Sequence, residues 1–531
     1  TLLTLSDIFK DLYVFTDQSK EPPENGFDFT PMDILKVLDT FLDNKHYTTD
    51  FEFYKDLRFT IKKLRDGHTD LISGCYFYNV LFDQQIYLYS VVENEKQLIK
   101  VFDDSVDRKN VDCEVTHINS KPALQVITEF ARTQLSTSRD LGVRFNDALV
   151  SVSQTKIAFT SNLFSVRNDL PESGSITYSL KCPNRKPFQL TRKWSIITNT
   201  FSRWNDTKTF QQYCSSTFPI SSIPEQKNAS SSTYGKAELV FEGTAANAYT
   251  IGKDLGVVEI NTFSFHRVRG FIEIGYKLAL QELAKRGVKK VVIDFSNNPG
   301  GFITFSIFLN GLLVPSKHIA FPTDLRVPPI IQKAIQRESG SNDSGGFYQA
   351  SGWNSFVTGK PFTSADQFIG NRSLTRGGTT NRYSALFNDI LTDQEINELK
   401  KKTKFPWDKD SIIILTNGHC ASACALASQY LTEIGQYQTV AVGGFLNQSL
   451  SFSTFPGGEL LNDGILPEIN APHQFQSNLA FSFTIREAYS LKNLTEVLDF
   501  KYKPADHRLS YDERNARDIS LLWEQAASFL K

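Results

Sequence analysis

Ser422 stands in the part of this sequence whose pattern most suggests covalent chemistry. An apolar run, Ile412 to Leu415, has the composition of a buried strand, and Thr416 to Gly418 is typical of a turn. From Ala423 onward, apolar residues recur at helical spacing. This order predicts a serine hydroxyl at a helix N-terminus, where backbone N–H groups favour a developing negative charge. Ser422 is therefore a candidate nucleophile, as in the nucleophile elbow of hydrolases, with an ordinary N-cap serine as the alternative.

A second strand and turn could supply the groups that stabilise such a charge. Lys289 to Pro299 reads KKVVIDFSNNP and is followed by Gly300 and Gly301. Glycine lets a backbone come close to a ligand, and an acyl-transfer enzyme needs backbone N–H donors beside its nucleophile. Asn-Pro-Gly-Gly on its own is an ordinary turn. If this turn lies beside Ser422, its backbone N–H groups are in place to form an oxyanion hole.

Taken together, the two motifs resemble those of a known enzyme family. Asp294 to Gly301 (DFSNNPGG) followed by Ala421 to Cys424 (ASAC) is similar to the tail-specific, or C-terminal-processing, serine peptidases. In that family a D-L-R-x-N-x-G-G turn precedes an A-S-A-S motif whose first serine is the nucleophile, which implies this role for Ser422. The resemblance also implies an α/β fold with a crotonase-like (ClpP/crotonase) peptidase core. A small helical module and a β-rich, PDZ-like domain would precede this core.

The general base differs between branches of this family. Most members use a lysine in a G-K-G motif after the serine, but the corresponding residue here is Asn447. The sequence therefore resembles the histidine branch, represented by tricorn protease and the chlamydial protease-like activity factor (CPAF-like). In that branch the base comes from the N-terminal region, where His68 stands in the run Asp66 to Thr69. An imidazole titrates near physiological pH, which suits a general base. His419, close to Ser422 in sequence, is expected to shape the turn or the pocket.

The orienting acid and the oxyanion donors also follow from the resemblance. In the histidine branch, a glutamate on a late strand precedes a turn that contains proline. Asp499, before the turn at Pro504, matches that position best, Glu487 is the alternative and Glu496 fits less well. By analogy with the family, the oxyanion donors are backbone N–H groups, those of Ala423 and of Gly300 or Gly301.

Two cysteines, Cys420 and Cys424, flank the candidate nucleophile. A zinc site would need two further ligands at fixed spacing, and His419 is the only one nearby. A thiol at Cys424 would point away from the turn, which disfavours a catalytic cysteine. Small apolar packing is the usual role of such residues, with a disulfide as the alternative. We therefore expect neither a metal nor a cofactor, and the pairing of the six cysteines stays open.

The elements that must position these residues fall into three regions. Residues 1–74 have apolar residues at helical spacing and form the helical module with the expected base. Residues 75–235 alternate like strands and end in a polar linker; within them, Glu114 to Ala123 (EVTHINSKPA) resembles the turn of a PDZ domain. Residues 236–531 alternate strands with helices, as in an α/β peptidase domain. Irregular residues from about 316 to 408 interrupt this pattern and predict an insertion that could cover the site.

The composition of the chain limits the classes of binding partner and the cellular compartment that we expect. The formal net charge of −1 and the absence of basic runs argue against nucleic acid as a partner. No apolar run is long enough to span a bilayer. The chain begins without a signal-like apolar region, so we expect any targeting segment to have been removed or never present. N-x-S/T tripeptides favour a secreted glycoprotein. They begin at Asn205, Asn228, Asn342, Asn371, Asn447 and Asn493.

The sequence thus predicts a serine endopeptidase that forms an acyl-enzyme on Ser422, with His68 as general base. Its substrate would be a protein or peptide. The alternative is a catalytically inactive family member that binds a peptide or a hydrophobic ligand, because the family's usual lysine is missing. An esterase would use the same site with a different pocket. The cleavage preference and the oligomeric state stay open, a homodimer being one option.

Overall fold

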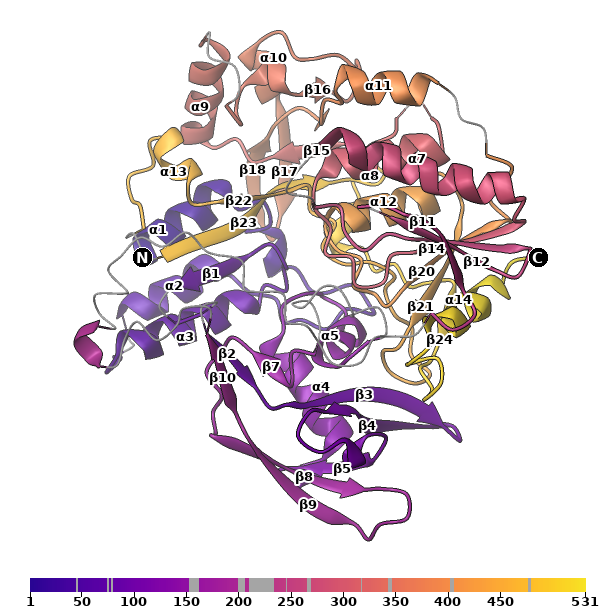
Figure 1. Ribbon diagram of the computed structural model, residues 1–531. Helices are drawn as coiled ribbons and strands as arrows, with labels where there is room; N and C mark the ends of the chain where they lie inside the picture. The colour runs from indigo at the N-terminus through magenta and orange to yellow at the C-terminus, as the bar shows by residue number, and fades with distance from the viewer. Residues whose placement is uncertain are drawn as a thin grey trace.

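The C-terminal half of the chain is built on a seven-stranded sheet with the order β11-β12-β13-β14-β20-β21-β24 (Figure 1). The five strands from β13 to β24 run parallel, and β11 and β12 are antiparallel to their neighbours. The strands are β11 (Glu238–Glu242), β12 (Asn247–Ile251), β13 (Leu255–Glu259), β14 (Lys290–Asp294), β20 (Ile412–Thr416), β21 (Gln438–Val442) and β24 (His507–Leu509). The computed structural model describes residues 1–43, 46–73, 76–77, 80–151, 162–198, 206–209, 234–244, 246–264, 269–316, 318–341, 346–401, 405–475 and 479–531.

Helices cover both faces of this sheet (Figure 1). On one face, α7 (Arg269–Arg286), α8 (Ile303–Leu313) and α12 (Ala423–Glu433) pack against side chains such as Val291 and Ile293. On the other face, α14 (Ile519–Ala527) packs against Val292. Alternate residues of β14 thus enter different cores, which explains why its sequence is a continuous apolar run. The predicted α/β core is confirmed, and β14, β20 and α12 lie where the sequence patterns placed them.

The N-terminal module is helical, as predicted. It contains α1 (Leu2–Asp7), continued by a π-helical segment η1 (Ile8–Leu12), then α2 (Ile34–Asp43) and α3 (Asp50–Lys62). The chain then enters β1 (Asp70–Ser73), which pairs antiparallel with β23 (Leu479–Ala488) from the far end of the sequence. This pairing brings the turn after α3 to the C-terminal half of the chain. The pair of β1 and β23 belongs to a second sheet, in which the strand order is β1-β23-β15-β19-β16 and β22 pairs with β23.

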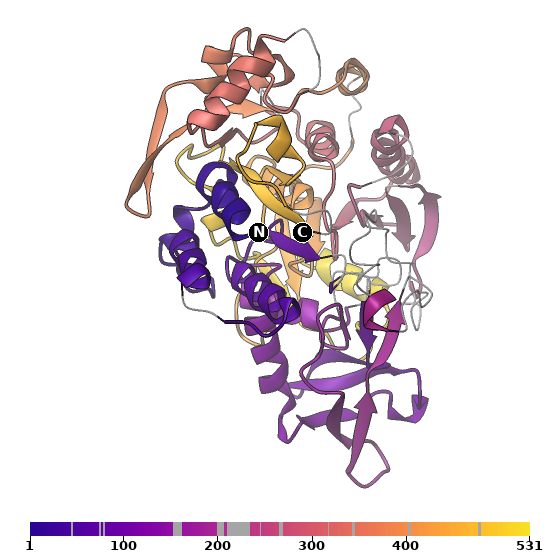
Figure 2. The same cartoon turned by 90° about the vertical axis from the view of Figure 1, so that its left-hand side faces the viewer.

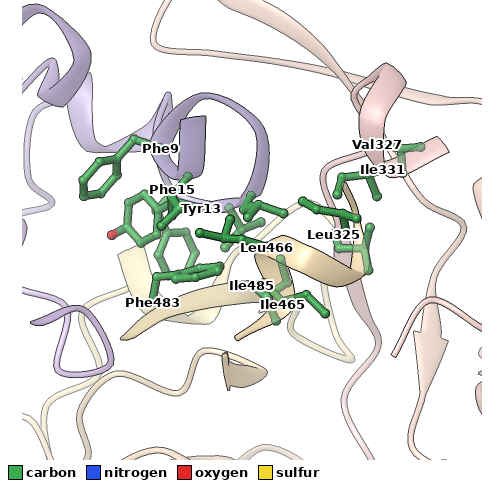
Figure 3. Packing of buried hydrophobic residues seen from close by; sticks show 14 of the residues in the cluster. Phe9, Tyr13, Phe15, Leu325, Val327, Ile331, Ile465, Leu466, Phe483 and Ile485 are labelled. Carbon is green, nitrogen blue, oxygen red and sulfur yellow. The ribbon is translucent and has the colours of Figure 1, made fainter. Parts of the chain in front are cut away.

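The segment from 316 to 408 is more regular than the sequence predicts. Its strands β15 and β19 extend the second sheet, and its side chains Leu325, Val327 and Ile331 share a core with Phe9, Tyr13 and Phe15 of the N-terminal module (Figure 3). Figure 2 shows both regions along one side of the molecule. Polar breakers hid this from the sequence, because the elements are short and share their core with a module that is distant in sequence. They are β15 (Thr323–Leu325), α9 (Pro329–Ser339), η5 (Ala350–Gly352), β16 (Asn354–Ser355), α10 (Ala365–Ile369), β17 (Arg372–Arg376), β18 (Thr379–Tyr383), β19 (Phe387–Asn388) and α11 (Asp393–Lys400).

In sequence, a β-rich region follows the helical module and precedes the α/β core; it lies at the bottom of Figure 1. Its main sheet has the order β3-β4-β5-β8-β9, and β6 pairs with β5 around the turn that resembles a PDZ domain. A disulfide joins Cys113 to Cys182. The elements are β2 (Val80–Asp83), β3 (Ile86–Glu93), β4 (Lys96–Asp104), β5 (Glu114–Ile118), β6 (Lys121–Pro122), α4 (Ala123–Gln134), α5 (Leu141–Ala148), β7 (Val166–Arg167), β8 (Ser175–Lys181), β9 (Phe188–Lys193) and β10 (Ser195–Thr198).

The remaining elements are short: the strand β22 (Glu459–Asn462) of the second sheet, and the helical segments η2 (Gln18–Lys20), η3 (Arg108–Asn110), α13 (Ile465–Glu468) and η6 (Leu498–Phe500). Within the described ranges, no helix combines the length and the apolar character that crossing a membrane requires.

Candidate active site

Ser422 lies between the end of β20 and the first turn of α12, as the sequence predicts. Its backbone has φ 55° and ψ −122°, a conformation with positive φ that a residue with a side chain rarely adopts. Its hydroxyl makes no capping hydrogen bond in the part of the chain that the structure describes. The N-cap alternative therefore does not describe the geometry. Strained backbone of this kind clusters at functional sites, where surrounding contacts hold it in place.

Those contacts come from two neighbouring segments. The N–H of Ala421 donates to the carbonyl of Asn298 at 2.9 Å, and the N–H of Ser422 donates to the carbonyl of Thr454 at 3.3 Å. The N–H of Thr454 in turn donates to the carbonyl of Cys420 at 2.9 Å. The turn that carries Ser422 is thus held on both sides by backbone hydrogen bonds.

His68 meets Ser422 although it comes from the opposite end of the chain. Its Nε2 lies 2.8 Å from Ser422 Oγ. The turn after α3 presents the ring, and the carboxylate of Asp66 accepts the backbone N–H of His68 at 3.0 Å and the hydroxyl of Thr69 at 2.7 Å. His68 is buried, and burial lowers its pKa while the nearby Asp66 partly opposes this. The imidazole is therefore neutral at pH 7, as a general base requires.

Thr484 of β23 contacts the other nitrogen of this ring. Its hydroxyl lies 3.3 Å from His68 Nδ1 and donates to Asp66 Oδ2 at 2.7 Å. Because that hydroxyl proton is directed to Asp66, the threonine oxygen can accept from Nδ1–H. The arrangement fits the tautomer that leaves Nε2 free to take a proton from Ser422. No local sequence signal marks Thr484, since its partners lie more than 400 residues away.

Asp499 is the predicted acid that the structure places near His68. It is buried in η6, and the Nη1 of Arg139 lies 3.7 Å from its Oδ1. Gly457 lies between acid and base: a Cβ on this glycine would stand 3.6 Å from both Asp499 Oδ1 and His68 Nδ1. Burial raises the pKa of Asp499 to about 7, with Arg139 opposing the shift and Asp66 adding to it.

Glu487, the alternative acid, belongs to a different cluster. It is fully buried, forms an ion pair with Arg376 and accepts the hydroxyl of Tyr489 at 2.5 Å. Its carboxylate is thus held by Arg376 and Tyr489, and in the part of the chain that the structure describes no hydrogen bond joins it to His68. The structure therefore does not bring Glu487 to the site. The Oε1 of Glu496, the least favoured candidate, lies 3.7 Å from the Nζ of Lys503, so this carboxylate forms an ion pair with that lysine.

The Gly-Gly turn packs directly against Ser422. Gly300 has φ +88°, and a Cβ on it would lie 2.4 Å from the carbonyl oxygen of Ala421 and 2.9 Å from the nitrogen of Ala423. Only glycine fits there. The N–H of Gly300 is engaged, since it donates to Asn298 Oδ1 at 2.8 Å. Within the described chain, the N–H groups of Gly301 and Ala423 have no hydrogen-bond partner. Of the predicted oxyanion donors, these two are the ones available.

Asparagines that the sequence analysis did not single out fix the two turns to each other. Asn417 Oδ1 accepts the N–H of Asn297 at 3.0 Å, and its Nδ2 donates to Asn297 Oδ1 at 2.7 Å. Asn298 Nδ2 donates to the carbonyl of Ile260 at 2.8 Å. Both segments are breaker clusters in sequence, which indicates turns but not this mutual bonding.

The other residues near the nucleophile have structural partners. His419 is buried, and its Nδ1 lies 3.0 Å from Asp147 Oδ1, which agrees with the expected role in shaping the turn. Cys420 and Cys424 form a disulfide. The sequence had left the pairing of these cysteines open. Because both sulfur atoms are in the disulfide, neither residue can act as a thiolate that binds zinc or attacks a substrate.

A cavity of about 790 Å³ opens beside the site, between α3 and the β-rich region. Gly67, the residue before His68, is part of its lining. In its lining, the guanidinium of Arg167 lies 4.4 Å from the ring centre of Phe130 and 5.0 Å from those of Phe164 and Trp194. The cavity therefore combines aromatic walls with charged side chains, among them Lys62 and Asp169.

Comparisons with known protein families bear on the class of this chain. Residues 81–200 match the CPAF-like PDZ domain, and residues 254–442 match peptidase family S41. The two regions together span more than half of the sequence, and the chain belongs to the tail-specific, CPAF-like peptidases of family S41. Its class is that of serine peptidases, which are hydrolases.

Solved structures show the same fold at low sequence identity. Mature CPAF complexed with lactacystin is 12% identical, with a TM-score of 0.61, and the match covers 99% of this chain and 96% of the CPAF chain. A second structure, of mature CPAF, is 13% identical with a TM-score of 0.61 and coverages of 99% and 94%. A comparison with curated protein sequences finds no match. The similarity therefore extends over the whole fold, including the helical module.

Proposed function

We propose that this chain is a serine endopeptidase that hydrolyses peptide bonds through an acyl-enzyme on Ser422, with His68 as general base. The observation that carries the proposal is the distance of 2.8 Å between His68 Nε2 and Ser422 Oγ. A nucleophile and a base within hydrogen-bond reach are the minimum for this chemistry. His68 can act as the base that the missing lysine would otherwise supply, so the absence of that lysine does not argue for an inactive protein.

In the first half of the reaction, Ser422 Oγ attacks the carbonyl carbon of the scissile bond while His68 Nε2 takes the hydroxyl proton. The carbonyl oxygen becomes an oxyanion beside the N–H groups of Ala423 and Gly301 and the N-terminus of α12. The imidazolium then gives its proton to the leaving amine, which departs and leaves an ester on Ser422. In the second half, a water molecule loses a proton to His68 and attacks this ester, and the acid product and the free serine result.

Thr484 and Asp499 support the base in this proposal. The Thr484 hydroxyl holds the ring with Nδ1 protonated, and the negative charge of Asp499 favours the imidazolium that forms in each half-reaction. Asp499 has the stronger claim to the orienting role because Glu487 is committed to Arg376. Its buried position near Gly457 makes it an electrostatic neighbour of His68.

The cavity that borders Gly67 provides room for a polypeptide next to the dyad. Its lining combines apolar side chains such as Phe130 with charged ones such as Lys62 and Asp169, which fits the mixed side chains of an extended or unfolded segment and supports a protein or peptide substrate. Lactacystin is bound in one of the CPAF structures that share this fold, and we expect it to inhibit this protein as well.

The test is digestion of fluorescein-labelled casein by the wild type and by Ser422→Ala. We expect release of fluorescent peptides by the wild type and a loss of at least about 10³-fold in Ser422→Ala. Ser351→Ala, at an exposed serine outside the site and outside the sequons, is the matched control and should digest casein at the wild-type rate. Full digestion by Ser422→Ala would overturn the proposal. A folded wild type that binds casein without cutting it would favour the binding-protein alternative.

We also propose that the protein is secreted and glycosylated. Three of the six sequon asparagines lie in the described residues, and all three are exposed: Asn371, Asn447 and Asn493. The two disulfides in the same part of the chain require an oxidising compartment to persist. Mass spectrometry of protein from the native host, before and after treatment with peptide-N-glycosidase, tests this: an unchanged mass would contradict glycosylation.

A further inference from the structure

We propose that the disulfide between Cys420 and Cys424 is a positioning device, which holds Ser422 in the strained conformation that aims its hydroxyl at His68. The proposal rests on the proposed function, because it assigns a role to residues through their effect on the nucleophile. The disulfide takes no part in the reaction itself, since neither the attack by the Ser422 hydroxyl nor proton transfer to His68 requires it.

The disulfide closes a small ring around Ser422. Its two cysteines are only 4 residues apart in sequence, and Ser422 is the middle residue of the ring. On one side, the backbone of Cys420 is fixed by its bond from the N–H of Thr454. On the other side, Cys424 lies in the first turn of α12, and its N–H donates to the carbonyl of Ala421 at 2.9 Å. The bond therefore ties the turn after β20 covalently to the helix that follows.

The conformation of Ser422 needs such a restraint. A residue with φ +55° costs conformational free energy that surrounding contacts must offset. A serine at this helix position has an alternative of lower energy: extended backbone with its hydroxyl capping a free N–H of the first turn. That relaxed conformation would take Oγ away from His68 Nε2. The ring restricts the backbone of residues 421 to 423 and so disfavours this relaxation.

A general stabilising role explains this bond less well. In the chain-entropy description, a disulfide stabilises a fold more when it closes a longer loop. Cys113 and Cys182 are 69 residues apart, so their bond restricts the unfolded chain far more than a bond over 4 residues does. Both Cys420 and Cys424 are fully buried in the apolar core beside Ile260 and Phe305, where alanine would also fit without a polar penalty. The distinctive property of the short bond is thus its place around the nucleophile.

The test compares the rate of labelling by a fluorophosphonate probe with thermal stability. The variants are Cys420→Ala, Cys424→Ala and the double variant, each measured well below its melting temperature. We expect all three to react at least about tenfold more slowly than the wild type, because a small displacement of a nucleophile has a large effect on rate. Since each variant removes the same bond, the loss in the double variant should equal the loss in either single variant. Packing roles would instead give losses that add.

Kinetics with a peptide substrate separate positioning from binding. We expect kcat to fall with KM unchanged, because the bond acts on the reacting atom and not on the cavity. The matched control is Cys113→Ala with Cys182→Ala, which should lower the melting temperature more and leave the labelling rate of folded protein unchanged. If this control does not fold, the equality of single and double losses at Ser422 still decides the question.

The outcomes separate the two proposals. Label on Ser422 in the wild type, at an equal rate in the three alanine variants, overturns the positioning role and leaves the proposed function intact. The positioning role is also overturned if the loss of labelling rate in the double variant equals the combined losses of Cys420→Ala and Cys424→Ala. A folded wild type that takes no label on Ser422 overturns the proposed function, and the positioning role falls with it.

Discussion

His68 Nε2 and Ser422 Oγ lie 2.8 Å apart although 354 residues separate them in sequence. The pairing of β1 with β23 brings them together, because it attaches the turn after α3 to the C-terminal half of the chain. Catalytic competence therefore depends on docking the helical module onto the α/β core. This dependence makes several features of the site open to experiment.

The pH profile should report Asp499. The pKa of Asp499 is raised to about 7, whereas that of His68 lies below its ordinary value of 6.5. If ionised Asp499 supports the imidazolium, kcat/KM rises as pH increases through about 7. In Asp499→Asn this ionisation is gone, so the acid limb should move below pH 6.5 and the plateau should fall by about tenfold or more.

Glu487→Gln is the matched control for this profile. It changes a buried carboxylate of the same region that pairs with Arg376. The charge of Glu487 contributes to the raised pKa of Asp499, so we expect the acid limb to move slightly to lower pH, with the plateau unchanged and stability lowered. An acid limb that moves in Glu487→Gln but not in Asp499→Asn would reverse the assignment of the acid.

Asp499 should also make the protein less stable at alkaline pH. Its pKa is higher in the folded chain than the ordinary value of 3.8, so the folded protein binds more protons than the unfolded chain between about pH 4 and pH 7. Stability is therefore lost as pH rises through this window. We expect Asp499→Asn to be more stable than the wild type at pH 8, by on the order of 1–4 kcal/mol, with a smaller gain at pH 4. Thermal unfolding at both pH values checks this, and an equal difference at the two would contradict it.

Gly300 should not tolerate a side chain. In Gly300→Ala the new Cβ would meet the carbonyl oxygen of Ala421 at 2.4 Å, so the turn under Ser422 must shift. We expect at least about a 100-fold loss of kcat/KM, together with lower stability. Gly378→Ala is the matched control: its φ of +77° is similar, but a Cβ there meets open space. It should cost about 1 kcal/mol of stability through backbone strain alone and leave activity unchanged. Similar losses of activity in both variants would mean that strain, and not contact with the nucleophile turn, is responsible.

Thr484 should matter for orientation of the base. Thr484→Val keeps the shape of the side chain but removes the hydroxyl that lies 3.3 Å from His68 Nδ1 and donates to Asp66. We expect kcat to fall by about tenfold with little change in KM, because the imidazole loses a partner of its correct tautomer. Thr484→Ser retains the hydroxyl and should restore most of the rate. A fully active Thr484→Val would show that Asp66 and the burial of the ring suffice.

The sequence predicted the parts of the site that follow from local patterns. A strand, a turn and a helix around Ser422, and the glycines at 300 and 301, are readable without any neighbour. His68 came from a resemblance, because nothing in its local sequence points to Ser422. Glu487, the alternative acid, shows the limit: its pairing with Arg376 forms only in the folded chain and cannot be predicted from the local sequence.

The residues that the sequence analysis missed act through tertiary contacts. Thr484 and Asn298 are ordinary polar residues until β23 and the Gly-Gly turn are in place. The pairing of Cys420 with Cys424 was one of several options, since spacing alone does not distinguish packing from a bond. The segment from 316 to 408 looked irregular because its elements are short and because it shares its core with the N-terminal module, which is far away in sequence.

The most direct test of the central claim is labelling with a fluorophosphonate probe followed by peptide mapping, on the wild type and on His68→Ala. We predict that the wild type carries the label on Ser422 and that His68→Ala reacts at least about 10³-fold more slowly, because the hydroxyl then has no base. Label on another residue, or equal labelling of Ser422 in both proteins, would contradict a serine that His68 activates.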